Sequence, residues 1–490
     1  MKARLASAVA AIALFSGCGP ESGGATGSIP LATSISRTDK QEGAKAKPQL
    51  LQEFGGAYTG PQANYTAAVG RKIAVQSSLS NAAGDFDVTL LNSSINNAFA
   101  TPGGYIYITR QLMALCNDEA EMAGVLGHEV GHVAALHGQR RQAAATRNAI
   151  GGALLQILTG AVLGNSGLGN ILQQGIGTGT QLLTLKFSRS QEYEADDLGI
   201  RYLGKAGYDP TALSSMLASL AAQSALDARV TGNGNAVPEW ASTHPDPASR
   251  VSRALGKAKE LGVVSKVRNR DAFLNALNGV TYDDDPAQGV VQGTRFIHPA
   301  LRFSFTSPNG YAMVNGTQAV TITGSGGQAQ FSGGAWSGDV GSYIAQVFKS
   351  VAGNGAVPSM TPTRTTINGV PAAYATVRAN SQSGQVDVSV FAYEMGSGQI
   401  YHFLTLAPAG QGVGPFGSMV QSFQKISVQD AAAVKARKVA IVTVKAGDTP
   451  SSLSARMAYT DYKLDRFLVL NGLRQNMTLT PGSKVKIVTY

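Results

Sequence analysis

His128-Glu129-Val130-Gly131-His132 is the stretch from which the fold of this chain can be worked out. Apolar residues recur at helical spacing around it, which predicts a helix with one buried face: Met122, Val125, Leu126, Val130 and Val133. Asn117 or Asp118 can cap its start, and Gly138 can end it. Residues four apart on a helix lie on one face, about 5–6 Å from each other. The two imidazoles can therefore reach a single Zn²⁺ ion.

The motif also places a carboxylate beside that metal. Glu129 follows the first histidine and can take a proton from water there. The alternative is a chance match, which average residue usage predicts about once or twice in a hundred chains of this length. However, the histidines fall in the buried part of the helix, where unpartnered polar groups are costly. The sequence therefore predicts one zinc ion held by His128 and His132, with Glu129 as a catalytic base.

Length and charge limit the classes of partner. The chain has 490 residues, enough for two or three domains. Its formal net charge of +10 is modest, and no Lys/Arg block dominates, so we expect no nucleic-acid partner. A mild attraction to anionic envelope surfaces accounts for the charge equally well.

The N-terminal residues have the pattern of an export signal. Residues 1–17 combine a basic start with an apolar run too short to span a bilayer, as in a signal peptide. Phe15-Ser16-Gly17-Cys18 resembles a bacterial lipobox, which implies that Cys18 is lipidated; an ordinary signal peptide is the alternative. Gly19 after this cysteine implies anchoring to the outer membrane, facing the periplasm. We expect residues 18–48, rich in Gly, Ser, Thr and Lys, to be a flexible tether.

A β-rich run precedes the predicted zinc helix. Metallopeptidases can pair an extended substrate with an edge strand beside the metal, and glycines allow close backbone approach. We therefore expect the substrate strand to contain Gly103, Gly104, Tyr105 and Ile106. A plain hairpin turn is an equally good interpretation.

Residues 97–109, the lead-in 117–121 and the H-E-x-x-H motif together resemble the HtpX/BepA-type zinc metallopeptidases, relatives of the CaaX prenyl proteases. The resemblance runs from about Phe54 to Arg250. It implies a mainly helical gluzincin domain with a small sheet, here placed at residues 49–268. Membrane-bound members carry transmembrane helices where residues 150–185 lie, but no apolar run of about 20 residues occurs there.

The resemblance also implies a third ligand on a later helix. The family's E-x-x-A-D pattern makes Glu192 that ligand, and Glu194 is the rival because it belongs to the same helix. Their spacing of two puts them on different faces, so only one faces the metal easily. Asp196 lies one turn from Glu192, where it can accept a hydrogen bond from a ligating imidazole.

Ser242-Thr243-His244-Pro245, with Arg250 further on, resembles a family segment that places its histidine near the metal. His244 could donate a hydrogen bond to the oxyanion of the reaction. Alternatively it could bind zinc as a fourth ligand and hold the enzyme inactive. We expect Arg250 to support the ligands from behind and His137 to lie outside the metal shell.

The rest of the chain predicts two further units. Residues 280–430 alternate β-rich runs with Gly/Ser/Asn turns, and the opening at residues 302–308 resembles the PsbP/Mog1-like fold. This α+β domain shows no catalytic pattern, so a binding or scaffolding role is expected. Residues 440–490 resemble a LysM module, which implies a βααβ fold and peptidoglycan binding; a docking or dimerisation module is the alternative.

The expected fold class is therefore α+β multidomain. The expected function is a zinc endopeptidase of the bacterial envelope that hydrolyses misfolded or stalled envelope proteins. A chaperone or assembly factor with a latent peptidase, and a peptidoglycan-docked scaffold, are the competing hypotheses.

Overall fold

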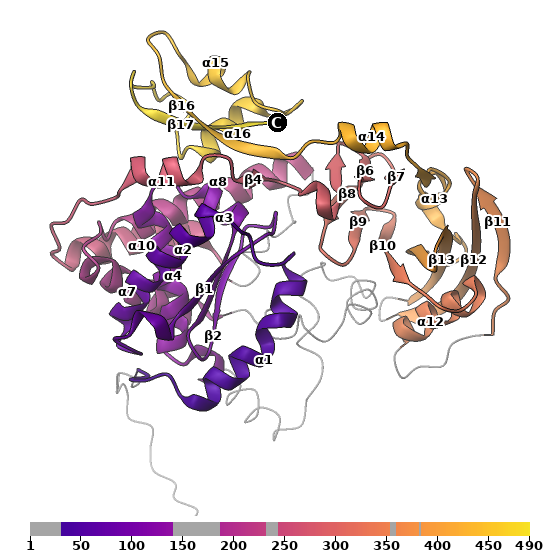
Figure 1. The fold of residues 1–490 in the computed structure, drawn as a ribbon, viewed down its shortest axis with the longest axis horizontal. Helices are drawn as coiled ribbons and strands as arrows, with labels where there is room; N and C mark the ends of the chain where they lie inside the picture. Colours follow the sequence, from indigo (N-terminus) through magenta and orange to yellow (C-terminus); the bar gives the residue numbers. More distant parts are fainter. Residues whose placement is uncertain (1–30, 141–186, 232–243, 353–358, 382–383) are drawn as a thin grey trace, which may run out of the picture.

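The computed structural model describes residues 31–140, 187–231, 244–352, 359–381 and 384–490. It divides into a helical domain with a small sheet, a sheet-rich domain and a C-terminal module (Figure 1), which confirms the predicted α+β multidomain class. The predicted signal peptide, Cys18 and the apolar residues 150–185 lie outside the described residues. Among the described residues, no helix is both long enough and apolar enough to cross a membrane.

The first domain is built around a three-stranded sheet in the order β1-β3-β2. Its strands are β1 (Asp87–Leu91), β2 (Ala98–Thr101) and β3 (Tyr105–Thr109), with β1 parallel and β2 antiparallel to β3. Side chains alternate across a strand. Ile106 and Ile108 therefore join the core under α2 (Pro61–Ala74) and α4 (Glu119–Ala134), whereas Tyr105 and Tyr107 face the other way. The remaining elements are η1 (Val75–Ser77), η2 (Ala83–Asp85), α3 (Arg110–Leu115), α7 (Arg189–Lys205), α8 (Ala212–Thr231), α10 (Pro247–Glu260) and α11 (Arg270–Leu277).

The tether prediction is wrong for its last part, because α1 (Arg37–Glu53) begins there. Ser36 caps this helix by accepting a hydrogen bond from the backbone N–H of Asp39. Ala46, Leu50 and Phe54 recur every four residues and cover the sheet face that carries Phe99, Tyr105 and Tyr107. The helix is thus held by tertiary packing of a narrow apolar stripe, although its sequence is mostly polar.

The expectation that the strand around Tyr105 is a sheet edge is also wrong, because β3 pairs on both sides. Gly103 and Gly104 do allow close approach, but to the chain itself. A Cβ on Gly103 would lie 2.4 Å from the carbonyl oxygen of Asp39, and one on Gly104 would lie 2.6 Å from that of Asp85. The edge strand beside α4 is β2, which pairs only with β3 in the described part of the chain.

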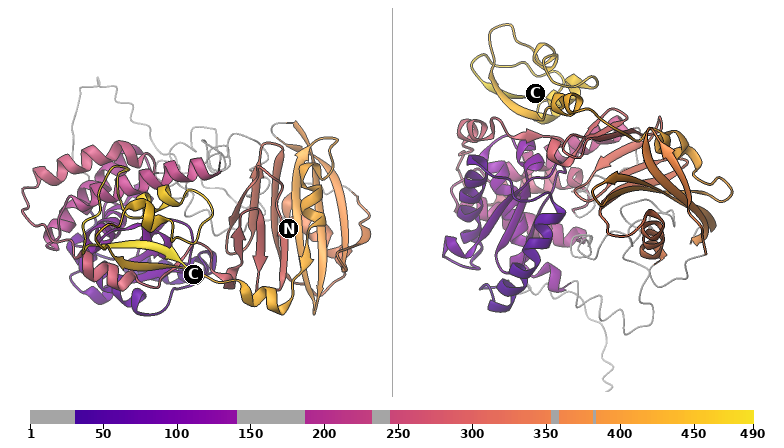
Figure 2. Two further views of the ribbon diagram at one scale, coloured as in Figure 1. Left: turned by 90° about the horizontal axis from the view of Figure 1, so that it is seen from above. Right: turned by 45° about the vertical axis from the view of Figure 1, so that its right-hand side comes forward.

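The second domain contains a seven-stranded antiparallel sheet in the order β11-β12-β13-β14-β10-β9-β8 and a four-stranded sheet, β15-β7-β6-β5. Helix α12 (Val340–Ala352) packs on one face of the larger sheet (Figure 2). β6, β7 and α13 pack on the opposite face, and an aromatic core fills the space between them and the sheet. Its elements are η4 (Pro286–Gln288), β5 (Val290–Gln292), β6 (Arg295–His298), β7 (Phe303–Thr306), β8 (Ala312–Asn315), β9 (Val320–Gly324), β10 (Gly327–Ala335), β11 (Thr363–Ile367), β12 (Val370–Ser381), β13 (Gly384–Gly396), β14 (Gln399–Pro408), η5 (Gly414–Phe416), α13 (Gly417–Gln421), β15 (Gln424–Lys425) and α14 (Val428–Ala433).

The C-terminal module has the βααβ order expected of a LysM module. It comprises β16 (Arg437–Thr443), α15 (Pro450–Ser454), α16 (Lys463–Leu470) and β17 (Lys484–Thr489). Strand β16 also pairs with β4 (Thr281–Tyr282), and the module shares one apolar core with the helical domain. Figures 1 and 2 show it resting on that domain and not on the larger sheet.

Candidate metal centre

Helix α4 carries the H-E-x-x-H motif and begins with a reciprocal cap. The Asp118 carboxylate accepts from the backbone N–H of Glu121 at 2.8 Å, and the Glu121 carboxylate accepts from the backbone N–H of Asn117 at 2.7 Å. The helix then crosses α7 at very short range. A Cβ on Gly131 would lie 3.0 Å from the carbonyl oxygen of Ala195, and one on Gly199 would lie 3.0 Å from the His128 nitrogen. These glycines bring the α7 carboxylates to the histidines.

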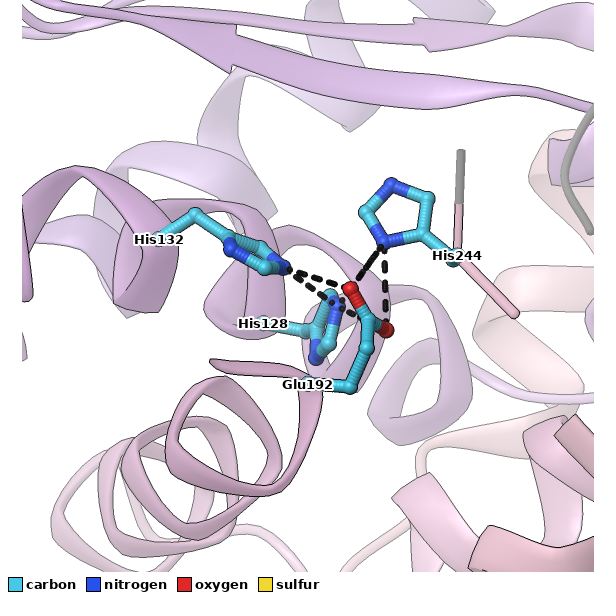
Figure 3. A group of neighbouring side chains, drawn as sticks. All are labelled: His128, His132, Glu192 and His244. Carbon is cyan, nitrogen blue, oxygen red and sulfur yellow. Dashed lines mark hydrogen bonds and ion pairs between the residues drawn. The ribbon is translucent and has the colours of Figure 1, made fainter. Parts of the chain in front are cut away.

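Four side chains converge between these helices (Figure 3): His128, His132, Glu192 and His244. Nε2 of His128 and Nε2 of His132 are 3.0 Å apart, and Oε1 of Glu192 is 3.3 Å from Nε2 of His132. Nδ1 of His244 lies 3.1 Å from the same carboxylate oxygen and 3.3 Å from Nε2 of His128.

This donor set fits a tetrahedral zinc ion. Zinc–ligand bonds of about 2.0–2.1 Å place neighbouring ligand atoms roughly 3.3–3.4 Å apart in a tetrahedron, close to the distances above. Three nitrogens and one carboxylate oxygen, all buried, are also a donor chemistry that zinc accepts. Glu194, the rival of Glu192 for the third ligand position, is not in the group.

The protonation states also suit a metal. Burial would raise the pKa of the Glu192 carboxyl, but the surrounding imidazoles of His244, His132 and His128 hold that pKa well below its usual range. Burial holds the pKa of His132 well below its usual range as well. An ionised carboxylate and a neutral imidazole are the forms that bind metal ions.

Asp196 and Arg250 support the ligands from behind, where the sequence predicted them. Oδ1 of Asp196 lies 3.0 Å from Nδ1 of His128, the ring nitrogen that faces away from the donor group. Arg250 donates to both oxygens of Asp196, at 2.9 and 2.6 Å, and also to Glu192. One guanidinium thus orients two buried carboxylates by charge-assisted hydrogen bonds.

Glu129 lies beside the donor group without belonging to it. Its side chain is almost fully buried, and Oε1 is 3.5 Å from Nε2 of His244 with no hydrogen-bond partner among the described residues. Burial is the largest influence on this carboxyl and raises its pKa, although electrostatic interaction with His244 and His128 acts in the opposite direction. A buried carboxylate with a raised pKa is suited to accept and release a proton.

Two contacts of His132 were not predicted from the sequence. The ring of Phe187 stacks on His132 with centroids 3.8 Å apart. Nδ1 of His137 lies 2.7 Å from Nδ1 of His132, although His137 does not belong to the group of candidate metal ligands. The chain turns back after α4 through Leu136, whose φ of 54° is left-handed. The sequence shows that His137 follows His132 by five residues, but it did not predict the left-handed turn that brings the two rings together.

The other two histidines, His298 and His402, lie in the second domain. His402 accepts or donates a hydrogen bond at Nδ1 with the hydroxyl of Tyr343, 2.8 Å away, and His298 packs against Phe296 and Phe303. Within the described ranges, one His/Cys/Asp/Glu group is close enough to hold a metal, and its four members are His128, His132, Glu192 and His244.

Comparison with known proteins agrees with this geometry. Residues 61–258 match the model of peptidase family M48, and residues 442–488 match the LysM domain model. The beta-barrel assembly-enhancing protease of Yersinia pestis is 34% identical over 185 residues, which are 36% of this chain and 35% of that protein. The mitochondrial metalloendopeptidase OMA1 of Arabidopsis thaliana is 32% identical over 174 residues, 35% of this chain and 31% of that protein.

The similarity is thus confined to part of each protein: the matched segment spans about a third of the length of these curated relatives. A crystal structure from Bacteroides thetaiotaomicron aligns with 32% of this chain and 55% of that chain, at 14% identity and a TM-score of 0.21. That alignment is too loose to inform the fold.

Proposed function

We propose that the domain matching peptidase family M48 is a zinc-dependent endopeptidase. The observation that carries the proposal is the convergence of His128, His132 and Glu192 around one point, with the buried carboxylate of Glu129 alongside. A zinc ion held there supplies Lewis-acid polarisation of a carbonyl and an acidified water molecule. A metal site without such a base would be adequate for structure but not for hydrolysis.

The chain's own residues perform the proton transfer and the substrate alignment. Glu129 takes a proton from water and returns it to the leaving amine. Arg250 donates hydrogen bonds to Glu192 and Asp196 and so fixes both carboxylates. The open edge of β2 runs next to α4, so an extended peptide can add to the sheet there by backbone hydrogen bonds.

One observation favours a second function, a chaperone or assembly factor whose peptidase is latent. Nδ1 of His244 is as close to Glu192 as Nε2 of His132 is, at 3.1 against 3.3 Å. A fourth protein ligand closes the position that a catalytic zinc site keeps open. In this function His244 is an inhibitory ligand, and the enzyme is active when His244 moves away.

The cellular setting that we propose is the bacterial envelope. Substrates would be misfolded or stalled envelope proteins. The name of the Yersinia pestis relative, beta-barrel assembly-enhancing protease, supports a link between proteolysis and the assembly of beta-barrel proteins. The LysM match supports docking to peptidoglycan, and the exposed loops of Ala446–Gly447 and Arg474–Asn476 are free to contact a glycan. Export with lipidation at Cys18 would hold the protein at the outer membrane, in the periplasm.

The direct test is Glu129→Gln, which removes the base and keeps the size of the side chain. We expect this variant to retain zinc and to lose cleavage of casein, an unfolded model substrate. Glu260→Gln, the same change on the surface of α10, should cleave like the wild type. Equal cleavage by Glu129→Gln and wild type would overturn the assignment of the base.

A further inference from the structure

His132 has a second contact that the ligand role does not explain. Its Nε2 faces the donor group, while its Nδ1 lies 2.7 Å from Nδ1 of His137. A contact this short between two ring nitrogens requires one N–H donor and one lone pair. The contact on the far side of the His137 ring decides which of the two Nδ1 atoms carries the proton.

The other ring nitrogen of His137 settles the question. Nε2 of His137 is 3.1 Å from Oε2 of Glu194, whose carboxylate is held by Arg140 through contacts of 2.8, 2.9 and 3.1 Å. An ionised carboxylate only accepts hydrogen bonds, so Nε2 of His137 is the donor. In a neutral His137, Nδ1 is then the acceptor, and His132 donates to it from Nδ1.

The consequence reaches the metal position. A neutral His132 that is protonated on Nδ1 carries its lone pair on Nε2, the nitrogen that faces Glu192 and His128. His128 also has a carboxylate partner on its Nδ1 side, but Asp196 contacts that nitrogen directly, without an intervening histidine. His137 is fully buried, so this contact is shielded from water.

We propose that Glu194 and His137 form a relay that positions His132, fixing its tautomer and ring orientation for a zinc ion. The inference rests on the metal site of the proposed function. Glu194, the sequence rival of Glu192 for the metal, is thereby given a different role on the opposite face of α7. Carboxylate partners of metal-binding histidines typically change metal affinity by 10- to 100-fold.

The test is zinc affinity of the full chain, measured by competition with a chromophoric chelator. We expect His137→Leu to weaken zinc binding by about 10- to 100-fold. His137→Asn, which can place an amide oxygen near the position of Nδ1, should recover most of that loss. The d–d absorption bands of the Co²⁺-substituted protein should shift in His137→Leu and return towards the wild-type spectrum in His137→Asn.

Glu194→Ala provides a second test at a partly exposed position, should His137→Leu fail to fold. We expect it to weaken zinc binding by roughly tenfold. Asp197→Ala is the matched control on the same helix, because Asp197 pairs with Arg253 and contacts none of these histidines. It should bind zinc like the wild type.

The two possible failures are distinguishable. Wild-type affinity in both His137→Leu and Glu194→Ala would overturn the relay and leave the metal site intact. A wild-type protein that binds no zinc would overturn the proposed function and the relay with it.

Discussion

The side-chain nitrogen of Lys486 lies 2.7 Å from the carbonyl oxygen of Cys116, and this contact joins the C-terminal module to the segment that leads into α4. The same nitrogen donates to the carbonyl oxygens of Ala114 and Leu115, at 2.8 and 3.3 Å. Lys486 is fully buried, and it caps the C-terminal end of α3. The module is therefore a structural part of the helical domain.

Lys486→Met should destabilise the protein by about 1–3 kcal/mol, because three buried carbonyl groups lose their donor. Removing a buried charge can be neutral where its partner is removed too, but these backbone carbonyls stay in place. Thermal or urea unfolding measures the effect. Lys445→Met, the same change at an exposed position of the module, is the control and should unfold like the wild type. Equal stability of both variants would show that the lysine cap is dispensable.

The second domain should lose stability in mild acid through His402. Burial lowers the pKa of this imidazole to about 4, below its usual value near 6.5. Between these values the unfolded chain binds a proton that the folded chain does not, so stability falls as pH decreases from about 6.5 to 4. The full effect is about 3 kcal/mol.

His402→Asn removes this titration and can keep a hydrogen bond with Tyr343. We expect the difference in unfolding free energy between wild type and this variant to change across pH 4–7 in the stated direction. A difference that stays constant with pH would show that His402 does not titrate in this way.

The open edge of β2 should be needed for substrates and not for folding. The backbone N–H of Thr109 donates to the carbonyl of Asn97, so these two residues form a hydrogen-bonded pair of the antiparallel ladder. Hydrogen-bonded and non-hydrogen-bonded pairs alternate along such a ladder, which makes Ala100 and Ile106 a non-hydrogen-bonded pair. The backbone groups of Ala100 consequently point away from β3. Ala100→Pro removes an N–H from the open side, which edge strands tolerate. We expect kcat/KM for peptide cleavage to fall at least tenfold with zinc content unchanged.

Ala100→Ser keeps that N–H and is the control, with cleavage expected near the wild-type rate. Unchanged cleavage by Ala100→Pro would place the substrate elsewhere.

His244→Ala tests the inhibitory role of this histidine. Its Nδ1 lies among the metal ligands and so occupies the position that the substrate carbonyl needs. We expect His244→Ala to retain zinc and to cleave casein severalfold faster than the wild type. Slower cleavage would instead assign His244 the role of oxyanion donor, with no latent state.

The metal site was predictable because local rules determine most of it. The helical repeat places His128 and His132 on one face. Resemblance to a family's E-x-x-A-D pattern identified Glu192, and Asp196 follows one turn later on the same helix. Which of Glu192 and Glu194 faces the metal depends on how α4 and α7 cross. Glycines on both helices allow the close approach at this crossing.

The errors have a common physical origin in long-range contacts. The sequence of α1 is mostly polar, so the apolar stripe of Ala46, Leu50 and Phe54 did not predict a helix. This stripe stabilises α1 only by packing on the sheet. Strand order is set by pairing between distant segments, so nothing local showed that β3 is central. A lysine in a strand is normally exposed, and Lys486 is buried only because the end of α3 supplies its acceptors.

The central claim is that Glu192, and not Glu194, completes the metal site with His128 and His132. Metal analysis and casein cleavage of the wild type, Glu192→Ala and Glu194→Ala, all prepared with saturating zinc, test it most directly. We expect one zinc per wild-type chain, loss of both zinc and cleavage in Glu192→Ala, and retention of both in Glu194→Ala. A Glu192→Ala variant that keeps its zinc and cleaves casein at the wild-type rate would contradict it.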